Sequence, residues 1–229
     1  MTEQPNLDGI TVVFDLDGTL VDTAPDLVAA LNVSLVDAGL NSVPQEAVRG
    51  QIGLGSKAML EEALRLQDKQ MSDAEIDAMR NIFLSHYAEN TANQSTPYPG
   101  VIDALNRLED AGAAFAICTN KPQGLADTLL DELKLRGRFR AIVGSDSVVA
   151  RKPDPSHLLQ TIALAVGKPQ SAIMIGDSNP DEKAAQNAGL PFVFIPFGYG
   201  PIDQSNKPRI ELPDYNKLTP DFILDLFSA

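Results

Sequence analysis

Short apolar runs recur along this chain, and each is followed by polar residues and then by a segment with helical spacing. The runs are residues 10–14, 113–118, 141–143, 172–175 and 192–195. Buried strands of a parallel sheet have this continuous apolar character, because helices cover both of their faces. The alternation therefore predicts an α/β fold in which a parallel sheet is covered by helices on both sides.

One long segment, residues 23–96, breaks the alternation. Its apolar residues, such as Leu27, Leu31 and Leu35, follow helical spacing, and no convincing strand lies among them. The segment ends in a connection rich in proline and glycine, residues 94–100, which is typical of a hinge. We expect a core made of residues 1–22 and 97–229 with a helical insertion at 23–96. In the late segment 199–214 we expect loops and one edge strand.

Composition limits the partners of the chain. Its 229 residues include 18 Lys and Arg against 31 Asp and Glu, a formal net charge of −13, which disfavours nucleic acid and anionic membranes. The single cysteine, Cys118, excludes an intramolecular disulfide and any site built from several cysteines. With no leader or membrane-spanning run recognisable, we expect a cytoplasmic monomer or homodimer that binds no membrane.

Polar side chains follow four of the predicted strands directly or after a loop. They are Asp15 and Asp17, then Thr119 and Asn120, then Lys152, and finally Asp177 and Asp181. Ligands of open parallel sheets bind outside the carboxyl ends of the strands, so we expect these residues to meet at one edge.

Asp15 and Asp17 point the same way if the segment is extended, which would crowd two carboxylates. A bound divalent cation or a shared proton would relieve the repulsion, and Asp177 would add a third oxygen ligand suited to Mg²⁺. The structural alternative is that Asp15 caps a helix and Asp17 is a solvated turn residue.

The remaining candidate site residues include groups that could bind an anion such as phosphate. Thr119 and Asn120 lie where a strand leads into a helix and would cradle phosphoryl oxygens, although both are also common caps. Lys152 would hold a phosphate oxygen near the acids, or else be solvated. Asp181 would either cap the next helix or position a metal-bound water or Lys152.

Four motifs occur in order along the chain: FDLDGTLVDT, CTNK, KPDP and GDSNPD. With them the sequence resembles the haloacid dehalogenase superfamily, most closely the phosphoglycolate phosphatase family, over about residues 9–200. The resemblance implies a Rossmann-like, doubly wound core with an inserted helical cap. It also implies these roles: Asp15 as nucleophile, Asp17 as general acid and base, Thr119 and Lys152 as phosphate-binding residues, and Asp177 as a Mg²⁺ ligand beside Asp15 and the backbone carbonyl of Asp17.

The resemblance further implies a Mg²⁺-dependent phosphomonoesterase that forms an aspartyl-phosphate on a small phosphorylated metabolite, with 2-phosphoglycolate favoured. The glycine-rich loop at 49–57 resembles a substrate-specificity loop, in which Arg49 or Lys57 would meet the substrate carboxylate. Alternatively, both cations face solvent. A β-phosphoglucomutase-like phosphomutase and a receiver-like phospho-signalling module are the competing functions. His86, His157 and Cys118 lie outside the expected chemistry.

Overall fold

The computed structural model describes residues 5–203, 205 and 209–228. The ends of the expected core at 1–4 and 229, and positions 204 and 206–208 of the expected edge-strand region, lie outside the described residues.

Within the described residues, six parallel strands form one sheet in the order β5-β4-β1-β6-β7-β8. The strands are β1 Thr11–Phe14, β4 Ala114–Cys118, β5 Ala141–Val143, β6 Ala172–Gly176, β7 Phe192–Phe194 and β8 Ile210–Glu211. The central strand β1 lies between β4 and β6, where Phe14 is level with Ile117 and Ile175. The parallel sheet predicted from the apolar runs is confirmed, with strand ends displaced by a residue at most.

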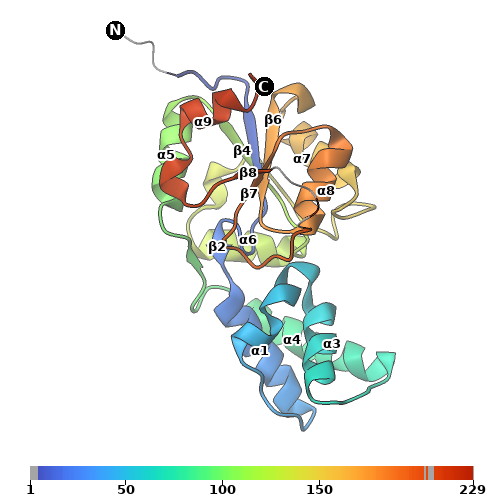
Figure 1. Cartoon of the computed structure of the whole chain (residues 1–229). Coiled ribbons are helices and arrows are strands. Elements are labelled where there is room, and N and C mark those ends of the chain that lie inside the picture. Colours follow the sequence, from blue (N-terminus) through green and yellow to red (C-terminus); the bar gives the residue numbers. More distant parts are fainter. Residues whose placement is uncertain (1–4, 204, 206–208, 229) are drawn as a thin grey trace.

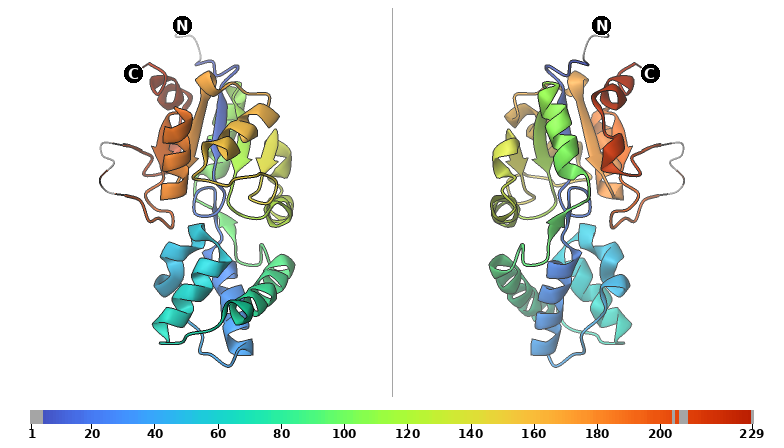
Figure 2. Two further views of the ribbon diagram at one scale, coloured as in Figure 1. Left: turned by 90° about the vertical axis from the view of Figure 1, so that its right-hand side faces the viewer. Right: turned by 90° about the vertical axis from the view of Figure 1, so that its left-hand side faces the viewer.

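Alternate residues of β1 enter two different cores. Val12 and Phe14 pack in the cluster under α5 (Val101–Asp110), α6 (Gln123–Glu132) and α9 (Pro220–Asp225). Val13 enters the opposite cluster, under α7 (Pro155–Leu164) and α8 (Asn179–Ala188). Figure 2 shows the sheet with helices on both sides. This two-faced burial is why the strands read as continuous apolar runs.

Four helices between residues 22 and 96 form a separate helical unit. They are α1 (Ala24–Asp37), α2 (Gln45–Val48), α3 (Ser56–Leu66) and α4 (Asp73–Glu89), with a 3₁₀ turn at Arg49–Leu54. Their apolar faces share one cluster, distinct from those of the sheet. Figure 1 shows this unit below the end of the sheet at which β2 is labelled. No helix among the described residues has the length and apolar content that crossing a bilayer requires.

Two short strands join the helical unit to the sheet. β2 (Val21–Asp22) and β3 (Thr96–Pro97) pair antiparallel, so the chain leaves and returns through one narrow ribbon. The expected edge strand in the late segment is β8, which pairs parallel to β7. The helical unit is therefore connected to the sheet through two adjacent chain segments, β2 and β3.

Candidate active site

Three carboxylates from different elements gather beyond the ends of β1 and β6. Asp15 follows β1, Asp177 follows β6, and Asp181 lies in the first turn of α8; one oxygen from each falls within 4.8 Å of the others. All three side chains are buried. The expectation that these residues meet at one edge of the sheet agrees with this geometry, although their roles stay predictions.

Lys152 reaches into this acidic group. Its Nζ lies 2.9 Å from Asp15 Oδ1 and donates to Asp181 Oδ1 and to the carbonyl oxygen of Cys118, both at 2.6 Å. Burial alone would lower the pKa of Lys152, but the charges of Asp15 and Asp181 outweigh it, so the pKa is raised. The ammonium is therefore a fixed positive charge beside Asp15.

The pKa of Asp15 is raised to about 6, chiefly because burial disfavours the carboxylate, while Lys152 opposes the shift and Asp181 adds to it. Burial also raises the pKa of Asp177, with Asp181 and Asp15 contributing. Two buried acids that both resist ionisation form a site that gains from an added cation.

Asp181 performs both functions that the sequence left open, as cap and as partner of Lys152. Its Oδ2 accepts from the backbone N–H and the hydroxyl of Ser178, at 3.1 and 2.6 Å, which closes a capping box at the start of α8. Its Oδ1 accepts from Lys152. The helix cap thus fixes the carboxylate that orients the lysine.

Asp177 is oriented by three donors. Its Oδ1 accepts from the Thr19 hydroxyl at 3.1 Å, and its Oδ2 accepts from the backbone N–H groups of Tyr199 and Gly200 at 2.6 and 3.3 Å. Gly18 approaches so closely that a Cβ there would lie 2.6 Å from Asp177 Oδ2. Glycine at position 18, with φ +81°, is required by both space and backbone conformation.

Tyr199 also links this loop to the helical unit. Its hydroxyl accepts from the backbone N–H groups of Thr23 and Ala24, at 2.6 and 2.8 Å, and donates to Asp22 at 2.7 Å. It therefore satisfies donors at the start of α1 that have no partner within the helix.

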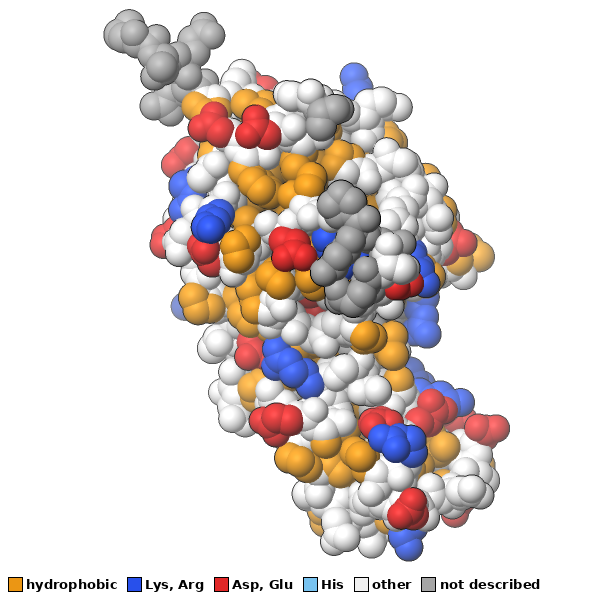
Figure 3. Space-filling view, viewed as in Figure 1, with side chains coloured by type: hydrophobic (Ala, Val, Ile, Leu, Met, Phe, Trp, Pro, Cys, Tyr) orange, Lys and Arg blue, Asp and Glu red, His pale blue; other side chains and the backbone are white. Residues whose placement is uncertain are grey.

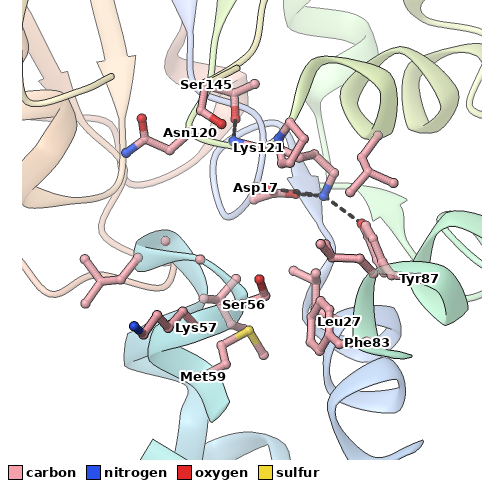
Figure 4. A pocket seen from close by; sticks show the side chains of 18 of the residues that line it. Asp17, Leu27, Ser56, Lys57, Met59, Phe83, Tyr87, Asn120, Lys121 and Ser145 are labelled. Atoms are coloured by element: carbon pink, nitrogen blue, oxygen red, sulfur yellow. Dashed lines mark hydrogen bonds and ion pairs between the residues drawn. The ribbon is translucent and has the colours of Figure 1, made fainter. Parts of the chain in front are cut away.

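Asp17 points away from the three clustered acids and toward Lys121. Lys121 Nζ donates to Asp17 Oδ1 and Oδ2 at 3.0 and 3.2 Å and to the Tyr87 hydroxyl at 2.7 Å, as Figure 4 shows. Burial lowers the pKa of Lys121, but Asp17 and Tyr87 reverse this, and the net pKa is raised. The predicted Mg²⁺ ligand at this position is the backbone carbonyl, so the direction of the side chain leaves that prediction in place.

Lys121 was missed by the sequence analysis, although it stands in the CTNK motif beside Asn120. Its side chain is 3% exposed and bridges an acid of the sheet edge to a tyrosine of α4. From the sequence alone, the polar character of this motif is assigned to Thr119 and Asn120. The partner of Lys121, Tyr87, lies 34 residues away in the chain, so the motif itself gives no sign of the contact.

Thr119 and Asn120 occupy the end of β4, as predicted. Thr119 is buried, and its hydroxyl accepts from the backbone N–H of Lys121 at 3.2 Å. Asn120 Nδ2 donates to the carbonyl oxygen of Lys152 at 3.1 Å, while its buried Oδ1 lacks a partner among the described residues. Asn120 thus supports the backbone of Lys152 and presents a free acceptor.

A cavity of about 290 Å³ lies between the sheet edge and the helical unit. Asp15, Asp17 and Thr119 line it from the sheet, and α3 and α4 supply the opposite wall. On the face shown in Figure 3, acidic and basic side chains are interspersed over both units, as on an ordinary solvated surface. A small polar molecule in this cavity would contact both units.

The two cations predicted to meet substrate differ in position. Lys57 lines the cavity, is 52% exposed and lies 3.9 Å from Glu61 and 3.7 Å from Asp73. Arg49 is absent from the described lining; its guanidinium donates to the carbonyl oxygens of Phe197 and Gly198 at 3.0 and 3.1 Å. In this arrangement Arg49 joins the helical unit to the core, and substrate contact by either residue stays a prediction.

The acidic group fits Mg²⁺ chemically. Asp15, Asp177 and Asp181 are buried, and one oxygen of each lies within 4.8 Å of the others. The available donors are carboxylate oxygens, the hard ligands that Mg²⁺ prefers. Asp15 and Asp177 would hold the ion, with the backbone carbonyl of Asp17 as a third ligand.

Fold and cavity together define a two-part α/β protein with an acidic site at the carboxyl edge of its sheet. A family model described as haloacid dehalogenase-like hydrolase matches residues 12–195. The chain belongs to this family. It is a phosphoric monoester hydrolase, in agreement with the class implied by its motifs.

Individual relatives support this assignment. A phosphoglycolate phosphatase from Mesorhizobium japonicum is 46% identical over 188 residues, covering 82% of this chain and 83% of the relative. One from Agrobacterium fabrum is 41% identical over 217 residues, covering 94% and 93%. The crystal structure of a predicted phosphoglycolate phosphatase from Haemophilus somnus superposes with a TM-score of 0.83 at 30% identity, covering 93% of this chain and 96% of the other.

Proposed function

We propose that the protein is a Mg²⁺-dependent phosphomonoesterase that acts through an aspartyl-phosphate on Asp15, with 2-phosphoglycolate as its substrate. The observation that carries the proposal is the fixed ammonium of Lys152 beside Asp15, whose side chain lines the cavity. The names of the relatives support the choice of substrate.

In the first step an oxygen of Asp15 attacks phosphorus, and the bond from phosphorus to the ester oxygen breaks as the acyl phosphate forms. Lys152 and Thr119 hold phosphoryl oxygens, so negative charge that develops there is balanced. Mg²⁺, when bound, would screen the repulsion between the carboxylates and the phosphoryl group. The leaving alkoxide takes a proton from Asp17.

In the second step Asp17 removes a proton from a water molecule, which attacks the acyl phosphate and releases inorganic phosphate and free Asp15. Residues 23–96 act as a cap that limits the entry of other water molecules. The single thiol, at Cys118, is buried and fits the reducing cytoplasm that we expect for this enzyme.

The test is the substitution Asp15→Asn, assayed by phosphate release from 2-phosphoglycolate. Loss of the nucleophile is expected to lower kcat at least ~10³-fold, and circular dichroism should show an unchanged fold. The exposed Asp37→Asn serves as the matched control and should retain wild-type activity. Full activity of Asp15→Asn would refute the assignment, and isomerisation of a hexose phosphate without net phosphate release would favour the phosphomutase.

A further inference from the structure

Among the described residues, four cationic side chains line the cavity, and the surroundings of three of them are already explained. They are Lys57, Arg80, Lys121 and Arg151. Lys121 is committed to Asp17 and Tyr87, Lys57 is half exposed near two acids, and Arg151 is exposed. Arg80 remains to be explained.

Arg80 lies on α4 and is partly buried. Its Nε donates to the hydroxyl of Ser56 on α3 at 3.1 Å, and no carboxylate pairs with its guanidinium among the described residues. The chain carries a formal net charge of −13, so acidic partners are abundant elsewhere. A partly buried guanidinium without one loses hydration without gaining an ion pair, which an anionic ligand would correct.

Ser56 also fixes which edge of Arg80 is free. Because the hydroxyl occupies Nε, the two terminal nitrogens stay available as a pair of parallel donors. That edge matches the two oxygens of a carboxylate, which arginine binds in bidentate fashion.

The surroundings strengthen such a pair. Apolar side chains of the helical unit line the same cavity: Leu27, Ile52, Met59, Phe83 and Leu84. Low local polarity makes an ion pair stronger than it would be in water. Asp15 and Asp17 line the same cavity from the sheet, whereas Arg80 comes from α4. Asp77 of α4 also lines it but forms no ion pair with Arg80 within the described part of the chain. One ligand in the cavity could therefore contact both the acids of the sheet edge and Arg80.

We propose that Arg80, oriented by Ser56, binds the carboxylate of the substrate and thereby selects phosphorylated acids over neutral phosphate esters. The inference rests on the proposed function, which supplies the phosphoryl end of the same molecule. The inference places the cation that binds the substrate carboxylate on α4. From the sequence, Arg49 or Lys57 of the loop at 49–57 is instead expected in this role.

The experiment compares two substrates that differ only at the end Arg80 would meet, 2-phosphoglycolate and 2-hydroxyethyl phosphate. In Arg80→Gln, kcat/KM for the acid divided by that for the alcohol is expected to fall at least ~10-fold, chiefly through KM, because one bidentate pair is lost. Arg80→Lys should recover part of the ratio. Arg65→Gln removes an exposed cation of α3 paired with Glu62 and should leave the ratio unchanged. An unchanged ratio in Arg80→Gln would overturn the inference.

A binding measurement separates this inference from the proposed function. Calorimetric titration of 2-phosphoglycolate into Asp15→Asn reports affinity without turnover. Adding Arg80→Gln should raise Kd at least ~10-fold, while phosphate alone should bind both variants alike. If the wild-type enzyme hydrolyses neither ester but Kd responds to Arg80, the proposed function fails and the carboxylate site stands. Absent binding, or an equal Kd in both variants, refutes the carboxylate site.

Discussion

His157 shows how one buried side chain supports the site without joining its chemistry. Its Nδ1 lies 3.3 Å from the backbone N–H of Lys152, and its Nε2 lies 3.0 Å from the carbonyl oxygen of Val143. A neutral imidazole protonated on Nε2 satisfies both contacts, accepting from one and donating to the other. Burial, aided by the charge of Lys152, lowers the pKa of His157 to about 4.

A lowered histidine pKa makes stability depend on pH with a definite sign. The unfolded chain takes up a proton below about pH 6.5, whereas the folded protein resists until about pH 4. The contribution of neutral His157 to the free energy of unfolding is thus complete above pH 6.5 and is lost as pH falls toward 4. Between pH 7.5 and 5.5 the wild type should lose roughly 1 kcal/mol more unfolding free energy than His157→Gln, measured by urea denaturation. Parallel losses in the two proteins would contradict the neutral, buried assignment.

At the scale of elements, Asp26 on α1 fastens the two crossings of the chain together. The side chain is buried and accepts from the backbone N–H groups of Gln94 and Ser95 and from the Ser95 hydroxyl. These donors lie just before β3, so the outgoing helix holds the returning strand. The connection at residues 94–100, predicted as a hinge from its prolines and glycine, is therefore held at its start by Asp26.

Asp26→Ala should lower the unfolding free energy by roughly 2–4 kcal/mol, because buried backbone donors lose a charged acceptor. Asp37→Ala, at the exposed end of the same helix, should change it by less than ~0.5 kcal/mol. Urea denaturation measures both variants. Equal stability of the two would show that the Asp26 contacts contribute nothing net.

At the scale of the whole molecule, the acidic site joins segments that are distant in the chain. Asp15 follows β1 and Asp177 follows β6, and the two side chains come together only when these strands pair in the folded sheet. A cation bound there would favour the folded state over the unfolded chain.

Mg²⁺ at about ten times its Kd is expected to add ~1.4 kcal/mol, which corresponds to a rise in Tm of roughly 3–6 °C for a chain of this size. Lowering the pH below about 6 should shrink the rise, since Asp15, with a pKa of about 6, then binds a proton in competition with the ion. Thermal denaturation with and without EDTA measures the effect. Asp177→Asn should abolish it, and an undiminished rise in that variant would exclude Asp177 as a ligand.

Local patterns in the sequence determined the parallel sheet and the residues at its carboxyl edge. An apolar run buried on both faces identifies a strand without knowledge of its neighbours, and the next polar residue then lies at the edge of the sheet. Asp15, Thr119 and Asp177 could be placed by that reasoning, whereas Lys152 follows its strand only after a loop.

Only the tertiary structure decided which side chains pair across the two units. Lys121 donates to Tyr87 of α4, and Tyr199 accepts from the first backbone N–H groups of α1. Arg80 has no acidic partner in the part of the chain that the structure describes. Such contacts join residues far apart in the chain, so the spacing of residues along the sequence does not predict them. Burial then fixes their electrostatic consequences, because the charge of a side chain depends on the water and partners that the folded molecule leaves to it.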